Sequence, residues 1–184
     1  MAGFISFAGA SVPDGYQEYQ MQWTYDTPDG NEITLNGTIE EANDQYEDLF
    51  PGELAKGEKP ELVTRQFEKD MTITCFNADP NPYGWEMAKL KRLEQGWNHL
   101  NRVPGKPSNG PGPGNCGRVS CSNDAAIWWC NDNDKPYTLD SFQVIGVAAA
   151  DICYQCTGGY ILEDCGGQAK STDNINVIVR KDDC

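Results

Sequence analysis

The chain has 184 residues, with 28 Asp and Glu against 14 Lys and Arg, and therefore a formal net charge of −14. Such a charge repels phosphate backbones and anionic lipid surfaces, which argues against nucleic acid or a membrane surface as the partner. No segment approaches the roughly 20 apolar residues that a membrane-spanning helix needs. The length suits one domain, with room for an appended subdomain.

The eight cysteines divide the chain into two parts, because all of them lie between Cys75 and Cys184. Residues 1–70 form an acidic N-terminal extension, and residues 71–184 a cysteine-rich α/β sandwich. Cysteine at this density is typical of secreted proteins, since reducing couples keep cytosolic thiols open. We therefore expect a secreted protein with four disulfide bonds, formed by Cys75, Cys116, Cys121, Cys130, Cys153, Cys156, Cys165 and Cys184.

A β-hairpin is expected near the start of the extension. Residues 19–25 alternate between large apolar or aromatic side chains and polar ones, which is typical of a half-buried strand. Thr27-Pro28-Asp29-Gly30 then predicts a turn. Ile33 and Leu35 continue the alternation on a return strand, and we expect this hairpin to pack on the main body.

Two more features follow the hairpin. Asn36-Gly37-Thr38 is an acceptor sequence for N-glycosylation at Asn36, which is consistent with the secretory route. Residues 39–50 are acidic and are a candidate short helix.

The cysteine-rich part contains a clearer succession of elements. Alternating apolar and polar side chains predict strands over residues 71–75 and 174–180, and residues 118–121 and 126–130 are interpreted as two further strands joined by the turn-prone Ser122-Asn123-Asp124. A first helix is expected to be capped by Asn81, to begin at Pro82 and to be ended by Pro104-Gly105, and a second to begin at Thr138 and end at Gly158-Gly159. The apolar face of the second helix holds Phe142, Ile145, Ala149, Ile152 and Cys153.

This order of elements is that of an α+β, split βαβ (ferredoxin-like) fold, an antiparallel sheet with both helices on one face. The opposite face, which carries Trp128, Cys130 and Ile178, would then lack cover. The aromatic side of the N-terminal hairpin is the first candidate to bury it, and a partner chain is the alternative. In such a sheet the first and third strands run side by side, so we expect Cys75 to pair with Cys130.

One stretch of the chain resembles a known group of proteins. Residues 115–133, which read Asn-Cys-Gly-Arg-Val-Ser-Cys-Ser-Asn-Asp-Ala-Ala-Ile-Trp-Trp-Cys-Asn-Asp-Asn, are similar to small secreted cysteine-rich proteins of filamentous fungi. The strand at 174–180 followed by Cys184 resembles their ending. The order of elements also resembles that of the α/β-sandwich killer toxins of fungi. These resemblances imply an extracellular effector or toxin-like protein, and they supply no catalytic motif.

Cysteine and histidine offer few routes to catalysis or metal binding. Cys153-x-x-Cys156 falls near the end of a predicted helix, where the helix dipole disfavours a thiolate, so we interpret the two residues as structural half-cystines. Together with Cys116-x4-Cys121 they could hold zinc, but disulfides account better for eight cysteines outside the cell. His99, the single histidine, lies off the apolar stripe of its helix and is expected at the surface.

Acidic residues are too numerous for a catalytic pair to be singled out, and a solvated acidic surface is the simplest interpretation. Residues 131–134 resemble the start of a calcium loop but lack its glycine and its distant glutamate. Trp128 and Trp129 point to opposite faces of a strand, so at least one of them is expected in the core rather than on a carbohydrate platform. We assign no catalytic, metal-binding or cofactor-binding residue.

These observations predict a secreted effector or toxin-like protein that binds a host or microbial protein or glycan, as a monomer or weak dimer, without turnover. A carboxylate-dependent hydrolase acting on wall polysaccharide is the first alternative. A structural or assembly protein of the cell wall is the second.

Overall fold

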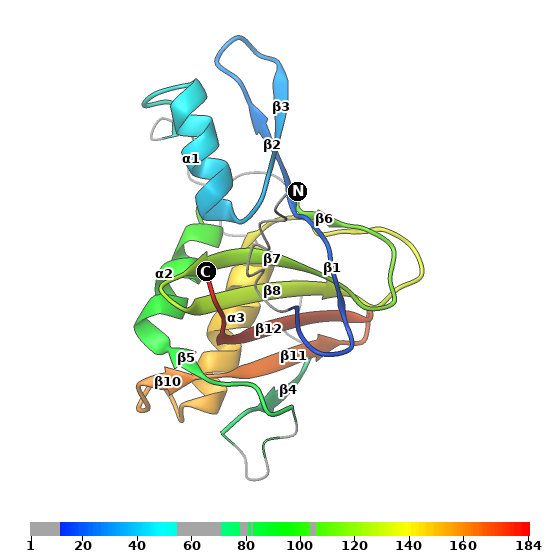
Figure 1. The fold of residues 1–184 in the computed structure, drawn as a ribbon, viewed down its shortest axis with the longest axis vertical. Helices are drawn as coiled ribbons and strands as arrows, with labels where there is room; N and C mark the ends of the chain where they lie inside the picture. Colours follow the sequence, from blue (N-terminus) through cyan, green and yellow to red (C-terminus); the bar gives the residue numbers. More distant parts are fainter. Residues whose placement is uncertain (1–11, 55–70, 78–80, 82, 104–105) are drawn as a thin grey trace, which may run out of the picture.

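The computed structural model describes residues 12–54, 71–77, 81, 83–103 and 106–184 (Figure 1). Its helices are α1 (Ile39–Leu49), α2 (Leu90–Leu100) and α3 (Gln143–Cys156). Its strands are β1 (Gln17–Glu18), β2 (Gln22–Asp26), β3 (Glu32–Asn36), β4 (Met71–Cys75), β5 (Ala88–Lys89), β6 (Ser108–Asn109), β7 (Asn115–Ser122), β8 (Ala125–Asn131), β9 (Tyr137–Thr138), β10 (Asp164–Cys165), β11 (Gly167–Ser171) and β12 (Ile175–Lys181). The mixed α and β class, the hairpin and the strands expected from alternation are confirmed.

Six strands form the main sheet, in the order β1-β7-β8-β12-β11-β4. Neighbours are antiparallel except β1 and β7, which pair in parallel. The split βαβ order is therefore wrong, because β12 rather than β4 lies beside β8. The cause is β11, which we did not expect: it pairs with β12 on one side and β4 on the other, and so places β4 at the edge.

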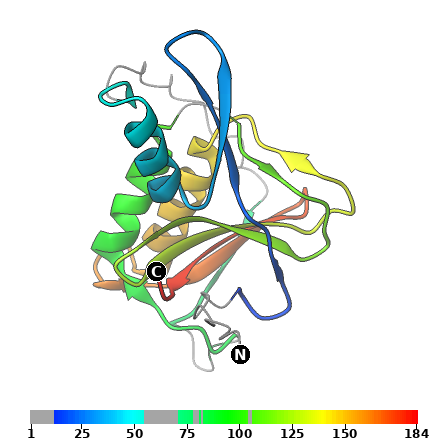
Figure 2. The same cartoon turned by 45° about the horizontal axis from the view of Figure 1, so that its top comes forward.

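Both α2 and α3 lie on one face of the main sheet and pack against each other, as predicted (Figure 2). Burial of their apolar stripes against the sheet is the main force that holds this layer. The five residues expected on the apolar face of α3 are all buried: Phe142, Ile145, Ala149, Ile152 and Cys153.

Both helices begin later than the sequence predicts, because the residues expected to cap them make other hydrogen bonds. The side-chain oxygen of Asn81 accepts the backbone N–H groups of Tyr83 and Gly84, each at 3.1 Å, which closes a turn rather than a helix. Pro82 lies outside the described residues. Thr138 belongs to β9, where its hydroxyl is 3.1 Å from that of Ser108 in β6.

The N-terminal hairpin is not the cover of the Trp128 face, contrary to expectation. It belongs to a second sheet of order β3-β2-β6-β9, on the same side of the main sheet as the helices. Trp23 of β2 stacks on Phe142 at the start of α3, with ring centroids 4.2 Å apart. Its indole N–H donates to the carbonyl oxygen of Gly37 at 2.8 Å. The hairpin thereby extends the helical layer instead of adding a layer behind the sheet.

Helix α1 confirms the predicted short helix and starts with a capping box. The Thr38 hydroxyl accepts the backbone N–H of Glu41 at 3.4 Å, and the Glu41 carboxylate accepts the Thr38 N–H at 2.7 Å. Asn36, the glycosylation candidate, is exposed at the end of β3. Thr38 therefore has two separable roles, as the helix cap and as the third residue of the acceptor sequence.

Replacing Thr38 by Ala is expected to lower the free energy of unfolding by about 1 kcal/mol, because the first turn of α1 loses its cap. Thr38→Ser retains both the cap and the acceptor sequence, and Asn36→Gln removes the acceptor sequence alone. Urea unfolding of the three variants, made without glycans, measures the cap by itself. An Asn36→Gln protein as unstable as Thr38→Ala would contradict this role for Thr38.

All eight cysteines form disulfide bonds, in the pairs Cys75–Cys156, Cys116–Cys130, Cys121–Cys184 and Cys153–Cys165. The expected pair of Cys75 with Cys130 is wrong, since β12 and β11 lie between the strands that carry them. Cys153 and Cys156 are structural half-cystines, as interpreted, and each bonds to a different element.

Candidate functional site

The outer face of the main sheet, the face turned away from α2 and α3, has an apolar half with its own small core. Trp128, Cys130 and Ile178 point to this side and are fully buried. Their cover comes from two loops, with Val12 and Tyr16 on one side and Phe76 and Trp85 on the other. The expectation that this face needs cover is confirmed, although the segments that supply it differ from the hairpin that we predicted.

The C-terminal end of β12 is fixed against this core by a buried ion pair. Arg180 and Asp182 are 3.3 Å apart, with side chains 7% and 4% exposed. The indole N–H of Trp128 donates to Asp182 at 3.0 Å, and the Arg180 guanidinium lies 5.4 Å from the ring centroid of Trp85. Removing either charge would break a buried ion pair and strongly destabilise the protein. We therefore interpret this pair as structural rather than reactive.

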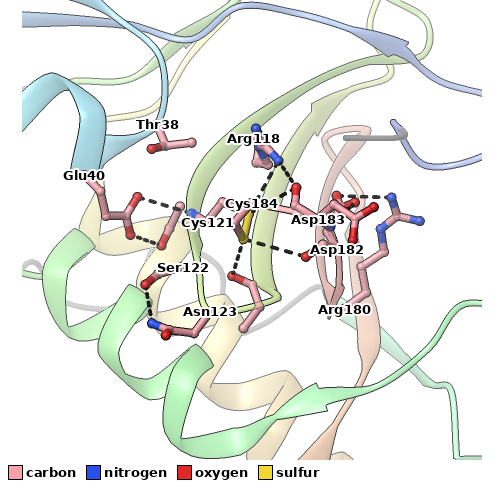
Figure 3. The surroundings of a disulfide bond; sticks show 12 residues. Thr38, Glu40, Arg118, Cys121, Ser122, Asn123, Arg180, Asp182, Asp183 and Cys184 are labelled. Atoms are coloured by element: carbon pink, nitrogen blue, oxygen red, sulfur yellow. Dashed lines mark hydrogen bonds and ion pairs between the residues drawn. A yellow bond between two sulfur atoms is a disulfide. The ribbon is translucent and has the colours of Figure 1, made fainter. Parts of the chain in front are cut away.

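Figure 3 shows the surroundings of the Cys121–Cys184 disulfide, where polar side chains also form hydrogen bonds that hold elements of the fold together. Arg118 donates to the backbone oxygen of Asp183 at 2.7 Å. On the other side of the disulfide, the Glu40 carboxylate accepts the Ser120 hydroxyl and, at 3.2 Å, the backbone N–H of Cys121. Glu40 thus ties α1 to β7.

An aromatic cluster stands over the outer face, formed by Phe76, Tyr83 and Trp85. The rings of Tyr83 and Trp85 are stacked, with centroids 4.8 Å apart and an interplanar angle of 20°. Phe76 meets both rings edge-on, at 5.6 and 5.3 Å. Phe76 and Trp85 are buried, whereas Tyr83 is 36% exposed. One aromatic ring is therefore held rigidly by the other two and presented to solvent.

Beside Tyr83, the outer face has a polar half with a hollow of about 310 Å³. The lining residues are Thr72 and Thr74 of β4, Gln168, Lys170 and Ser171 of β11, the following Thr172, and Tyr83 itself. In the sheet, Thr74 pairs with Gln168 and Thr72 with Lys170. Because side chains alternate along a strand, these four project to the same side, away from the helices.

A chain of hydrogen bonds supports the hollow from beneath. The Gln168 amide donates to the Tyr83 hydroxyl, and its oxygen accepts the Asn176 amide at 3.2 Å. The Asn176 amide also donates to the Tyr16 hydroxyl at 3.0 Å. Burial raises the pKa of Tyr16 above its ordinary value. Gln168 is only 2% exposed, so its position is fixed before any ligand arrives.

A larger cleft of about 540 Å³ lies on the other side of the aromatic cluster, and Trp85 and Met87 are among its lining residues. Two surface ion pairs involve four further lining residues: Lys181 with Glu86, at 2.7 Å, and Lys89 with Asp164, at 2.8 Å. The hydrogen bond from Lys181 lowers the pKa of the Glu86 carboxyl. A general acid needs the opposite shift, so Glu86 is unsuited to that role at neutral pH.

The remaining residues considered from the sequence lie elsewhere. His99 is exposed, with its Nε2 2.9 Å from the side-chain nitrogen of Asn43. Asn131 is buried, and its side-chain oxygen accepts the backbone N–H of Asn133 at 3.0 Å, as in an ordinary turn. Both Trp128 and Trp129 are buried, where we expected at least one of them to be. Among the described residues, no group of three or more His, Cys, Asp or Glu side chains is placed to hold a metal ion.

Sequence analysis overlooked the polar half of the outer face. Its lining residues come from two strands and a loop, and one of those strands, β11, was not expected. The available signal was faint: Thr72 and Thr74 alternate with apolar residues, and Asn176 interrupts the apolar β12. Polar residues at regular strand positions are ordinarily solvated, and only the fold brings these beside Tyr83.

No helix of the described ranges is both long and apolar enough to cross a membrane. Comparisons of the chain with protein-family models, with curated proteins and with solved structures find no match.

Proposed function

We propose that the protein is a secreted effector or toxin-like binding protein of fungal origin, which acts outside the cell on a host or competitor molecule through its outer face. The Tyr83 ring beside a polar hollow supports binding at this face. The extracellular location is supported by the four disulfides. Together they close every thiol in the chain, as suits an oxidising extracellular environment.

Binding rather than turnover is supported by how the carboxylates in and around this face are used. Glu40 and Asp182 accept structural hydrogen bonds, and Glu86 and Asp164 pair with lysines. Among the described residues that line the hollow beside Tyr83, none is a carboxylate. A rigid aromatic ring beside a fixed amide suits recognition, since few groups must be ordered when the ligand binds.

The test applies the purified, oxidised protein to plant leaf tissue and, separately, to competing fungi and bacteria. We expect a visible response or growth inhibition in at least one of these settings. The matched control is the same protein after reduction and alkylation, which has the same composition without the folded face. Inertness of the oxidised protein in every setting would overturn the proposal, and release of sugars from wall material would replace it with a hydrolase.

A further inference from the structure

We infer that the hollow beside Tyr83 is a glycan-binding site, which takes a sugar unit of a wall polysaccharide or surface glycan. This inference rests on the proposed function, since it names the ligand class of the same face. Three properties of the hollow support this inference. They are the aromatic ring of Tyr83, which forms one wall of the hollow, the uncharged hydrogen-bonding groups that line it, and the positive charge of Lys170.

The ring of Tyr83 forms the aromatic wall of the hollow. Trp85 covers one face of the Tyr83 ring and Phe76 meets its edge, so the remaining surface of Tyr83 is the part available to a ligand. Sugar rings carry apolar C–H faces, which pack on aromatic rings, together with hydroxyl groups that need hydrogen bonds. Tyr offers a large apolar surface at little cost in conformational entropy, because its ring has few rotatable bonds.

The uncharged polar groups match the other part of a sugar. Thr72, Thr74 and Thr172 supply hydroxyls that can both donate and accept. The Ser171 hydroxyl already accepts the backbone N–H groups of Asp173 and Ile175 and can therefore only donate, and the Gln168 amide is held by its hydrogen bond to Tyr83. Beneath them, the fully buried Asn176 amide donates to the side-chain oxygen of Gln168 at 3.2 Å, which helps to hold the Gln168 amide in place at the hollow.

Charge narrows the class of glycan. Lys170 is the single charged residue among the described residues that line the hollow, in a chain of net charge −14. The site therefore accommodates neutral sugars and has an added attraction for uronic acids, but it offers nothing to a cationic ligand. The volume of about 310 Å³ is at the lower end of ligand pockets, which fits one sugar unit of a longer chain.

The experiment measures binding of the intact, four-disulfide protein by isothermal titration calorimetry. The probes are chitohexaose, laminarihexaose and cellohexaose as neutral glycans, and oligogalacturonate as the acidic one. We expect binding to at least one probe. Lys170→Gln distinguishes the two sources: it leaves a neutral glycan unaffected and weakens an acidic one about threefold, as for an exposed ion pair.

Two variants test the location. Tyr83→Ala is expected to weaken binding about tenfold through loss of the aromatic wall. Thr72→Tyr fills the hollow from an exposed strand position that favours Tyr, so it should abolish binding while the fold is retained. Tyr154→Ala is the control, since Tyr154 is 58% exposed on α3 and belongs to the helical layer.

Binding that is lost in Tyr83→Ala and Thr72→Tyr and kept in Tyr154→Ala supports the site. If Tyr83→Ala fails to form its disulfides, Thr72→Tyr alone decides. The inference is overturned if no probe binds, or if binding survives in Thr72→Tyr. Glycan binding without any biological response would remove the effector function and leave the site intact, whereas a response without glycan binding would do the reverse.

Discussion

A protein in which Cys75 and Cys156 are both replaced by Ala is expected to lose about 4–5 kcal/mol of its free energy of unfolding. This disulfide spans 81 residues of sequence and joins the edge strand β4 to the end of α3. Without it, the unfolded chain gains the entropy of a long open loop. Guanidinium unfolding, followed by tryptophan fluorescence, measures the loss.

The matched control replaces Cys153 and Cys165 by Ala, because that disulfide leaves the same helix but spans only 12 residues. Chain entropy predicts a smaller loss there, about 3 kcal/mol. Side-chain packing predicts the opposite order, since Cys153 and Cys165 are fully buried whereas Cys75 is half-buried. A greater loss in the control pair would therefore reject the entropic account.

Trp23→Ala is expected to destabilise the protein by about 3–5 kcal/mol, as is usual when a buried tryptophan is removed. Trp23 is 1% exposed and stacks on Phe142, so its loss opens a cavity between the N-terminal hairpin and α3. We expect fluorescence and circular dichroism to show one coincident transition, because the hairpin and the helices share a core.

The control for this substitution is Leu49→Ala, at a residue 54% exposed on α1, which should change stability by less than about 0.5 kcal/mol. Two separate transitions in the Trp23→Ala protein would show that residues 1–70 fold independently of the remainder. The prediction would then apply to the extension alone, and the shared core would contribute little to cooperativity.

The elements that could be predicted from sequence are those whose own residues show an apolar pattern that indicates burial. β8 is an unbroken apolar run from Ala125 to Cys130, β12 places Ile175, Val177 and Val179 at alternate positions, and α3 has a continuous apolar stripe. Such patterns identify a strand or helix without knowledge of its neighbours.

The elements that could not be predicted from sequence are those whose structure depends on residues distant in the chain. β11 reads Gly-Gln-Ala-Lys-Ser and carries no strand pattern, yet it is extended because β12 and β4 offer hydrogen bonds on both sides. That single insertion changed the strand order and invalidated the expected Cys75–Cys130 pair. Thr138 and Asn81 have the right chemistry for helix caps, but Thr138 is hydrogen-bonded to Ser108 of β6 and Asn81 closes a turn with the residues that follow it.

The candidate site shows the same limit more strongly. Tyr83 lies in a stretch without regular structure, and Gln168 lies in the unexpected strand. Nothing in the sequence indicates that the two are neighbours, because 85 positions separate them. A site assembled from a loop and two strands is visible only once the topology is known.

Two disulfides join the last turn of α3 to other elements, and they also restrain the loop that follows the helix. Cys153–Cys165 closes a short ring around Tyr160, Ile161 and Leu162, which are 46%, 81% and 47% exposed. Exposed apolar loops are ordinarily the first segments to open locally, and therefore the first to be cut by proteases or to associate. Here both ends of the loop are anchored to buried sulfur atoms, so its opening requires the end of α3 to leave the core. The chain can therefore expose these apolar side chains without giving up its folded state.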